Sequence, residues 1–184
     1  PLWNKEHLSQ TMKQWEGINY RTPLTIGAIT IEFIDAGHIL GSAIIVIRYK
    51  DTAIAFSGDL GNPPVPLLNP FDIPENIMYV VAESTYGDRA HEMGEERRIK
   101  LERTLEDIHA RGGVLLILSF AMERTQELLY EINDLVEHHR IPRMPIFLDS
   151  PLAIKATRAF QQFESYFNKE ALRQISSGDD IFAF

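Results

Sequence analysis

The first half of the chain alternates apolar and polar positions in short runs, the pattern of β-strands that lie on a half-buried sheet. Gly27 interrupts the first of these runs and is the expected turn between two strands. A continuous apolar run at 77–84 is typical of a buried strand, and the proline-rich stretch 62–76 before it predicts a loop. Strands are therefore predicted within 24–37, 43–49, 52–59 and 77–84.

From about residue 91 onward, apolar residues recur at helical spacing instead, as at Ile99, Leu101, Leu105 and Ile108. Two apolar stretches between the helical segments read as buried strands. The change of period places a domain boundary near residue 91, giving two domains, 1–91 and 92–184. Helices are predicted at 4–15, with Asn4 as a cap, and within 92–111, 123–139 and 151–167, and the two later strands at 114–120 and 144–150.

Composition narrows the chemistry. The 184 residues are 45% hydrophobic and 24% charged, which is typical of a globular protein, and they include no cysteine. Disulfides and thiolate metal sites are thereby excluded, so any metal must be bound by histidine or carboxylates, which suits zinc or manganese. The net charge of −8 argues against a basic nucleic-acid-binding face, except where bound cations neutralise the carboxylates.

Membrane association is not expected. The sequence has no apolar run of roughly 18 residues and no signal-peptide pattern. These features predict a soluble, cytoplasmic protein without a membrane partner.

Three polar clusters follow predicted strands: "DAGHILGSA" with His38, "FSGDLG" with Asp59, and "ESTYGDRAH" with Glu83. Loops at strand ends commonly carry binding and catalytic residues. Each cluster also has a structural interpretation: a packed turn histidine, an aspartate that caps a plain turn, and a surface ion pair between Glu83 and Arg89.

Taken together and in this order, the three clusters resemble motifs of the β-CASP branch of the metallo-β-lactamase superfamily. That branch includes ribonuclease J and the endonuclease subunit of the eukaryotic cleavage and polyadenylation machinery. "LILSFAMERTQELL" and "IFLDSPLA" resemble the early β-CASP insert. The resemblance implies an α/β fold: part of a metallo-β-lactamase αββα sandwich over 1–91, then part of the β-CASP domain over 92–184.

The resemblance also implies roles for individual residues. His38 stands where the family has a zinc ligand, and Asp59 where it has the carboxylate that bridges two zinc ions. Glu83 stands at the acidic residue that supports proton transfer by orienting a later histidine. The implied function is that of a zinc-dependent ribonuclease acting on RNA in processing or decay. Arg124 and Ser150 are candidate phosphate contacts at strand ends facing the cleft between domains, although Arg124 could equally form an ion pair with Glu127.

One family signature is missing, because no His-x-His-x-Asp-His occurs among the six histidines. In the family this signature precedes the His38 loop and two further histidines follow the insert, so both are expected outside this sequence. The chain is therefore interpreted as the middle of such an enzyme. A DNA-processing β-CASP nuclease and a catalytically inactive RNA-binding paralogue are the alternatives, and a homodimer stays open.

Overall fold

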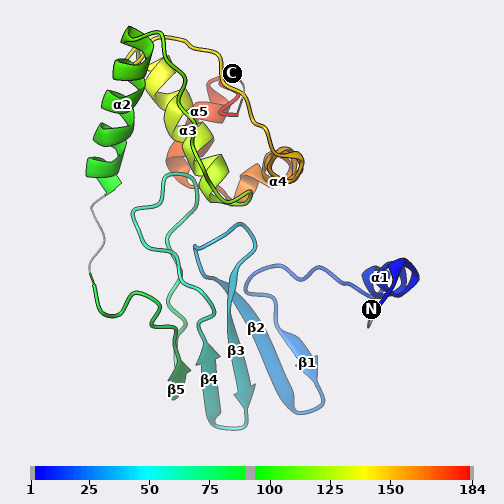
Figure 1. Ribbon diagram of the computed structural model, residues 1–184. Helices are drawn as coiled ribbons and strands as arrows, with labels where there is room; N and C mark the ends of the chain where they lie inside the picture. The colour runs from blue at the N-terminus through cyan, green and yellow to red at the C-terminus, as the bar shows by residue number, and fades with distance from the viewer. Residues whose placement is uncertain (1–2, 90–93, 183–184) are drawn as a thin grey trace.

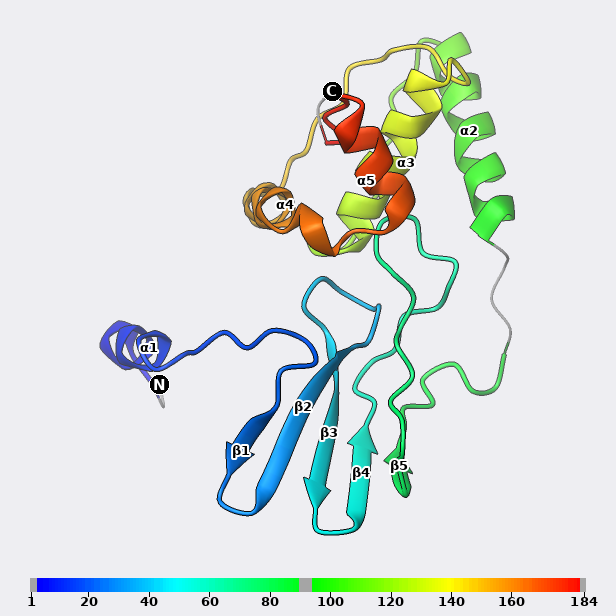
Figure 2. The same ribbon diagram turned by 180° about the vertical axis from the view of Figure 1, so that it is seen from behind.

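The computed structural model describes residues 3–89 and 94–182, which form a sheet region and a helical region (Figure 1). The sheet region consists of the strands within 24–81 and the loop that follows them to residue 89, and the helical region spans 94–182. The loops at one end of the sheet lie between the two regions in both views (Figures 1 and 2). The boundary expected at residue 91 falls within 90–93, outside the described residues, so its position stays a prediction.

The sheet has five strands in chain order. Neighbouring strands from β1 to β4 pair antiparallel through short connections, whereas β5 runs parallel to β4. The predictions for the first four strands are confirmed, including the turn at Gly27, whose φ is +60°. Their bounds are β1 Leu24–Ile26, β2 Ile29–Asp35, β3 Ala43–Tyr49, β4 Thr52–Phe56 and β5 Tyr79–Val81.

The core of the sheet region is small. It consists of buried side chains on one face of the central strands and at their ends, with Leu60 and Ile77 packed against them. The prediction of a buried strand at 77–84 is wrong in extent and in burial, because β5 has three residues and all are exposed. No other element in the described part of the chain covers this sheet edge. The buried residues are Ile34, Ala36, Ile44, Val46 and Ala55.

The first helix, α1 (Lys5–Met12), begins as predicted at Asn4, whose side chain accepts a hydrogen bond from the His7 N–H at 2.9 Å. None of its residues is buried. Figures 1 and 2 show it apart from both the sheet and the other helices.

The helical region confirms the predicted helices, with differences at their ends. The third predicted helix ends at Gln162 and is followed by a short 3₁₀ turn, and α5 was not predicted. The elements are α2 Gly94–Ala110, α3 Arg124–Glu137, α4 Pro151–Gln162, η1 Glu164–Tyr166 and α5 Lys169–Ser176.

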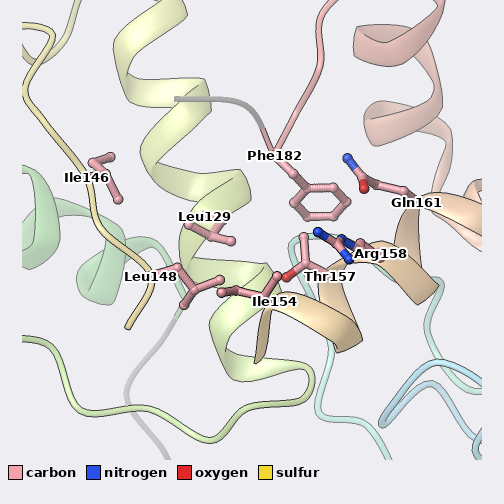
Figure 3. Close-up of a pocket in the computed structure, with 8 residues that line it drawn as sticks. All are labelled: Leu129, Ile146, Leu148, Ile154, Thr157, Arg158, Gln161 and Phe182. Atoms are coloured by element: carbon pink, nitrogen blue, oxygen red, sulfur yellow. The ribbon is translucent and has the colours of Figure 1, made fainter. Parts of the chain in front are cut away.

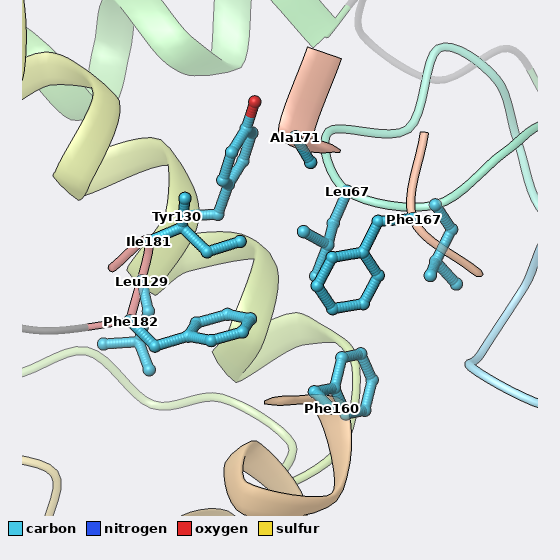
Figure 4. Packing of buried hydrophobic residues seen from close by; sticks show 9 residues of the cluster. Leu67, Leu129, Tyr130, Phe160, Phe167, Ala171, Ile181 and Phe182 are labelled. Atoms are coloured by element: carbon cyan, nitrogen blue, oxygen red, sulfur yellow. The ribbon is translucent and has the colours of Figure 1, made fainter. Parts of the chain in front are cut away.

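The largest core lies among α3, α4 and α5 and includes part of the proline-rich loop (Figure 4). Leu67 and Leu68 of that loop are buried against aromatic side chains, including Phe160 and Phe167. Asn168 ties the same loop to the start of α5 by donating a hydrogen bond from its side-chain amide to the Pro66 carbonyl at 2.9 Å. The proline-rich loop therefore joins the sheet region to the helical core.

The two strands predicted at 114–120 and 144–150 are wrong. Both segments lie outside the assigned strands, and along the first of them Val114, Leu118 and Phe120 are 93%, 89% and 85% exposed. A strand requires a neighbouring backbone to satisfy its N–H and C=O groups, and the residues described here supply no such neighbour to either segment. The apolar pattern therefore identified segments with a preference for extended conformation, but it could not show whether a neighbouring strand is present to pair with them.

The mixed arrangement of one sheet and several helices confirms the predicted α/β class. No helix within 3–89 or 94–182 is both long and apolar enough to cross a lipid bilayer.

Candidate metal and catalytic site at the motif loops

The loop after β2 carries His38 on a backbone fixed by local hydrogen bonds. The Asp35 carboxylate accepts a hydrogen bond from the Gly37 N–H at 2.8 Å. At the other end of the loop, the Ser42 hydroxyl oxygen accepts from the N–H groups of His38 and Ile39 at 3.2 and 3.1 Å. The half-buried His38 therefore lies on a stiff turn, because side chains at both ends of the loop, Asp35 and Ser42, bind its backbone N–H groups.

The loop after β4, which carries Asp59, packs backbone to backbone against the His38 loop. The Gly61 N–H donates to the Ala36 carbonyl at 2.8 Å. A Cβ atom on Gly61 would lie 1.8 Å from the Gly37 carbonyl oxygen, far inside van der Waals contact. Glycine is therefore required at Gly61 for this approach of the two motif loops.

The third motif is tied to the second through Glu83. Its carboxylate accepts hydrogen bonds from the Leu60 N–H at 2.7 Å and from the Thr85 N–H at 3.3 Å. These bonds, chiefly the one from Leu60, lower the pKa of Glu83, and nearby His38 lowers it further. The alternative ion pair with Arg89 is wrong, since Arg89 contacts Asp88 at 3.2 Å instead.

The helical region supplies two buried carboxyl groups that the sequence analysis did not identify as site residues. Glu123 accepts a hydrogen bond from the Leu40 N–H in the His38 loop at 3.2 Å. Burial, reinforced by neighbouring Glu127, raises the pKa of Glu123 to about 8. Burial likewise raises the pKa of Glu127, although Arg124 and, more weakly, His38 oppose that shift.

His38 thus lies in the electrostatic range of one carboxyl group from the sheet region, Glu83, and one from α3, Glu127. The available sequence signal was the i, i+4 spacing of Glu123 and Glu127, which places them on one face of a helix.

The two candidate phosphate contacts were predicted at strand ends, but both lie at the starts of helices. Arg124 is the first residue of α3 and forms the alternative ion pair with Glu127, at 2.8 Å. Ser150 caps α4, with its hydroxyl oxygen accepting from the Ala153 N–H at 3.2 Å. Contact of either residue with RNA stays a prediction.

The described residues do not form a complete metal site. They contain no group of three or more histidine or carboxylate side chains able to bind one ion. Imidazole and carboxylate are the right donors for zinc, but His38 and Asp59 alone are fewer than the roughly three protein ligands of a catalytic zinc site. Asp59 is exposed at the surface of its loop.

Two pockets elsewhere do not include the motif residues. A cavity of about 300 Å³ lies between α3 and α4 and is bordered by Leu129, Leu148 and Phe182, among others (Figure 3). A second cavity, of about 580 Å³, is bordered by Arg98 and Arg140. Both arginines are already paired with acidic side chains, Arg98 with Asp134 and Arg140 with Glu102. The candidate site is therefore the set of joined motif loops and not a closed pocket.

Sequence comparison with known proteins finds one matching domain family and several similar proteins. Residues 125–184 match the Beta-Casp domain family. The chain is 34% identical over 182 residues to ribonuclease TTHA0252 of Thermus thermophilus, a match that covers 99% of this chain and 42% of that protein. It is 32% identical over 175 residues to endoribonuclease ysh-1 of Neurospora crassa, covering 94% of this chain and 21% of that one.

A third relative is cleavage and polyadenylation specificity factor subunit 3 of Dictyostelium discoideum, 27% identical over 176 residues, with 95% of this chain and 23% of that protein covered. The match to the Beta-Casp domain at 125–184 and the similarity to these proteins confirm the resemblance to the β-CASP family stated from the motifs. It spans less than half the length of each of these three relatives.

Proposed function

We propose that the full-length protein carrying this sequence is a zinc-dependent ribonuclease that hydrolyses RNA phosphodiester bonds. The observation that carries the proposal is the direct joining of the three motif loops. Gly61 bonds to Ala36, and Glu83 bonds to Leu60, so the three loops that carry His38, Asp59 and Glu83 are joined to one another. The names of the relatives, two of which are ribonucleases, support RNA as the substrate.

In this proposal, His38 and Asp59 are two members of a larger zinc ligand set whose other members are not among the described residues. Zinc, when bound, supplies charge neutralisation for the phosphate and lowers the pKa of water. The chain's own contribution is to hold an imidazole and a carboxylate on two loops that cannot move independently.

Glu83 has a separate task. Because the Leu60 and Thr85 N–H groups lower its pKa, Glu83 is ionised at neutral pH and cannot itself donate a proton to a leaving group. A fixed carboxylate of this kind can instead orient a histidine and stabilise its protonated form. That role agrees with the one the family resemblance implies for Glu83.

Arg124 and Ser150 are proposed as secondary phosphate contacts, because each already binds another group of the chain. We also propose that 1–91 and 92–184 are parts of a metallo-β-lactamase domain and a β-CASP domain.

Digestion of single-stranded RNA and DNA of one sequence by the full-length protein tests the function. We expect faster RNA cleavage that a zinc chelator abolishes. Faster cleavage of DNA would identify a DNA-processing nuclease instead, and zinc-loaded protein that cleaves neither substrate would identify an inactive paralogue.

A further inference from the structure

We propose that Glu123 is a positioning residue for RNA hydrolysis, acting from the helical region to hold the loop that carries His38. This inference rests on the proposed ribonuclease function. The bond between the Glu123 carboxylate and the Leu40 N–H joins residues that are 83 positions apart in the sequence.

The Glu123 contact binds a backbone N–H group of the His38 loop that no residue of the loop itself binds. Ser42 binds the N–H groups of His38 and Ile39, and the next N–H along the chain, that of Leu40, is bound by Glu123. Successive amides of the loop are thus fixed from within the sheet region and then from the helical region. The Leu40 side chain also packs against the core of the helical region.

Glu123 is a poor choice for stabilising its own helix. It occupies the N-cap position of α3, but its side chain makes no capping hydrogen bond, and its φ of +61° is in the left-handed region. Serine, threonine, aspartate or asparagine is preferred at an N-cap, and burying a carboxyl group costs free energy. Glu123 is nevertheless only 8% exposed, and its carboxyl group accepts a hydrogen bond from the His38 loop. Local helix stability does not explain these features, whereas loop positioning does.

The expected consequence is catalytic. Displacing a reacting group by about 1 Å can cost on the order of 10²-fold in rate. Loss of the Leu40 contact should therefore lower kcat by about 10- to 100-fold and change KM little, because Glu123 does not contact RNA in this account.

Three substitutions in the full-length protein separate positioning from fold stability. Glu123→Gln keeps an accepting oxygen at the same reach and should retain near wild-type kcat. Glu123→Ala removes the acceptor. Glu123→Asp keeps a carboxyl group and offers a better N-cap, but its shorter side chain cannot reach Leu40 without movement of the backbone. We expect Glu123→Asp to lose kcat while remaining folded.

Glu131→Ala is the matched control, because Glu131 lies two turns further along the same face of α3, and burial raises its pKa as it does that of Glu123. Its carboxyl group has no hydrogen bond to the His38 loop among the described residues. Its kcat should equal that of wild type.

The test is kcat and KM for RNA cleavage, together with hydrogen–deuterium exchange of the amides at 38–42. Faster exchange in Glu123→Ala and Glu123→Asp, but not in Glu123→Gln or Glu131→Ala, is the expected result. Wild-type kcat and exchange in Glu123→Asp, or equal losses in Glu123→Gln and Glu123→Ala, would overturn the inference. If wild-type protein does not cleave RNA, the proposed function fails, and the exchange rates still decide whether Glu123 holds the loop.

Discussion

The sheet region and the helical region contribute differently to the candidate site. The sheet region presents the motif residues on loops, and backbone hydrogen bonds and a glycine contact fix those loops. The helical region contributes carboxyl groups whose environment is set by burial, Glu123 and Glu127. The ligand candidates and most of the bonds that fix their loops come from the sheet region, whereas Glu123 binds the His38 loop from the helical region.

The largest expected effect concerns the sheet side. In the full-length protein, Asp59→Asn should lower RNA cleavage by at least about 10³-fold, because a neutral amide cannot neutralise two cations. Asp51→Asn is the control, since Asp51 is an exposed carboxylate in the turn between β3 and β4, at the far end of the sheet from Asp59. Cleavage by Asp59→Asn within tenfold of wild type would show that Asp59 does not bridge zinc.

The contact between the two motif loops should be the next most sensitive feature. Gly61→Ala places a methyl group on the Gly37 carbonyl and should lower the free energy of unfolding by about 3 kcal/mol. Gly17→Ala is the control, because a Cβ at Gly17 meets no atom within 4 Å. Urea denaturation of both variants measures the difference, and equal stabilities would mean that the loops separate at little cost.

A smaller effect concerns the helical side and its dependence on pH. Because the pKa of Glu123 is raised in the folded protein, its proton is bound more tightly there than in the unfolded chain. This contribution to stability is fully present below the unfolded pKa of about 4.5 and is lost as pH rises through about 8.

Glu123→Gln cannot lose a proton, so it should reduce the fall in stability between pH 5 and 7 by about 2.5 kcal/mol. Urea denaturation at several pH values measures this slope, with Glu137→Gln at the other end of α3 as the control. A slope unchanged by Glu123→Gln would mean that the buried carboxyl group does not titrate in this range.

The strands of the sheet region could be predicted from the sequence because each of β1 to β4 pairs with its neighbour along the chain. Alternation then identifies both the strand and its partner. The segments 114–120 and 144–150 carry an equally strong apolar pattern, but pattern alone does not supply a pairing edge. β5 was placed correctly in the chain and wrongly in the interior for the same reason, since burial depends on what covers a strand.

For the candidate site, too, the sequence predicted the residues in local motifs but not the contacts between distant segments. The motifs single out His38, Asp59 and Glu83 as candidates. Their loops meet because β2, β4 and β5 run in the same direction and end at the same edge of the sheet. Glu123 could not be identified in this way, because its contact with Leu40 joins two regions that local periodicity treats separately. The ion pair of Arg124 with Glu127 was among the alternatives because both residues lie within one helical turn.

Zinc titration by calorimetry, on residues 1–184 and on the full-length protein in parallel, tests the central claim most directly. That claim is that this chain supplies only part of a metal ligand set, through His38 and Asp59. We predict two tightly bound zinc ions for the full-length protein, and neither a two-zinc centre nor RNA cleavage for residues 1–184. Two zinc ions bound to residues 1–184 with submicromolar affinity, or chelator-sensitive cleavage by them, would contradict the account.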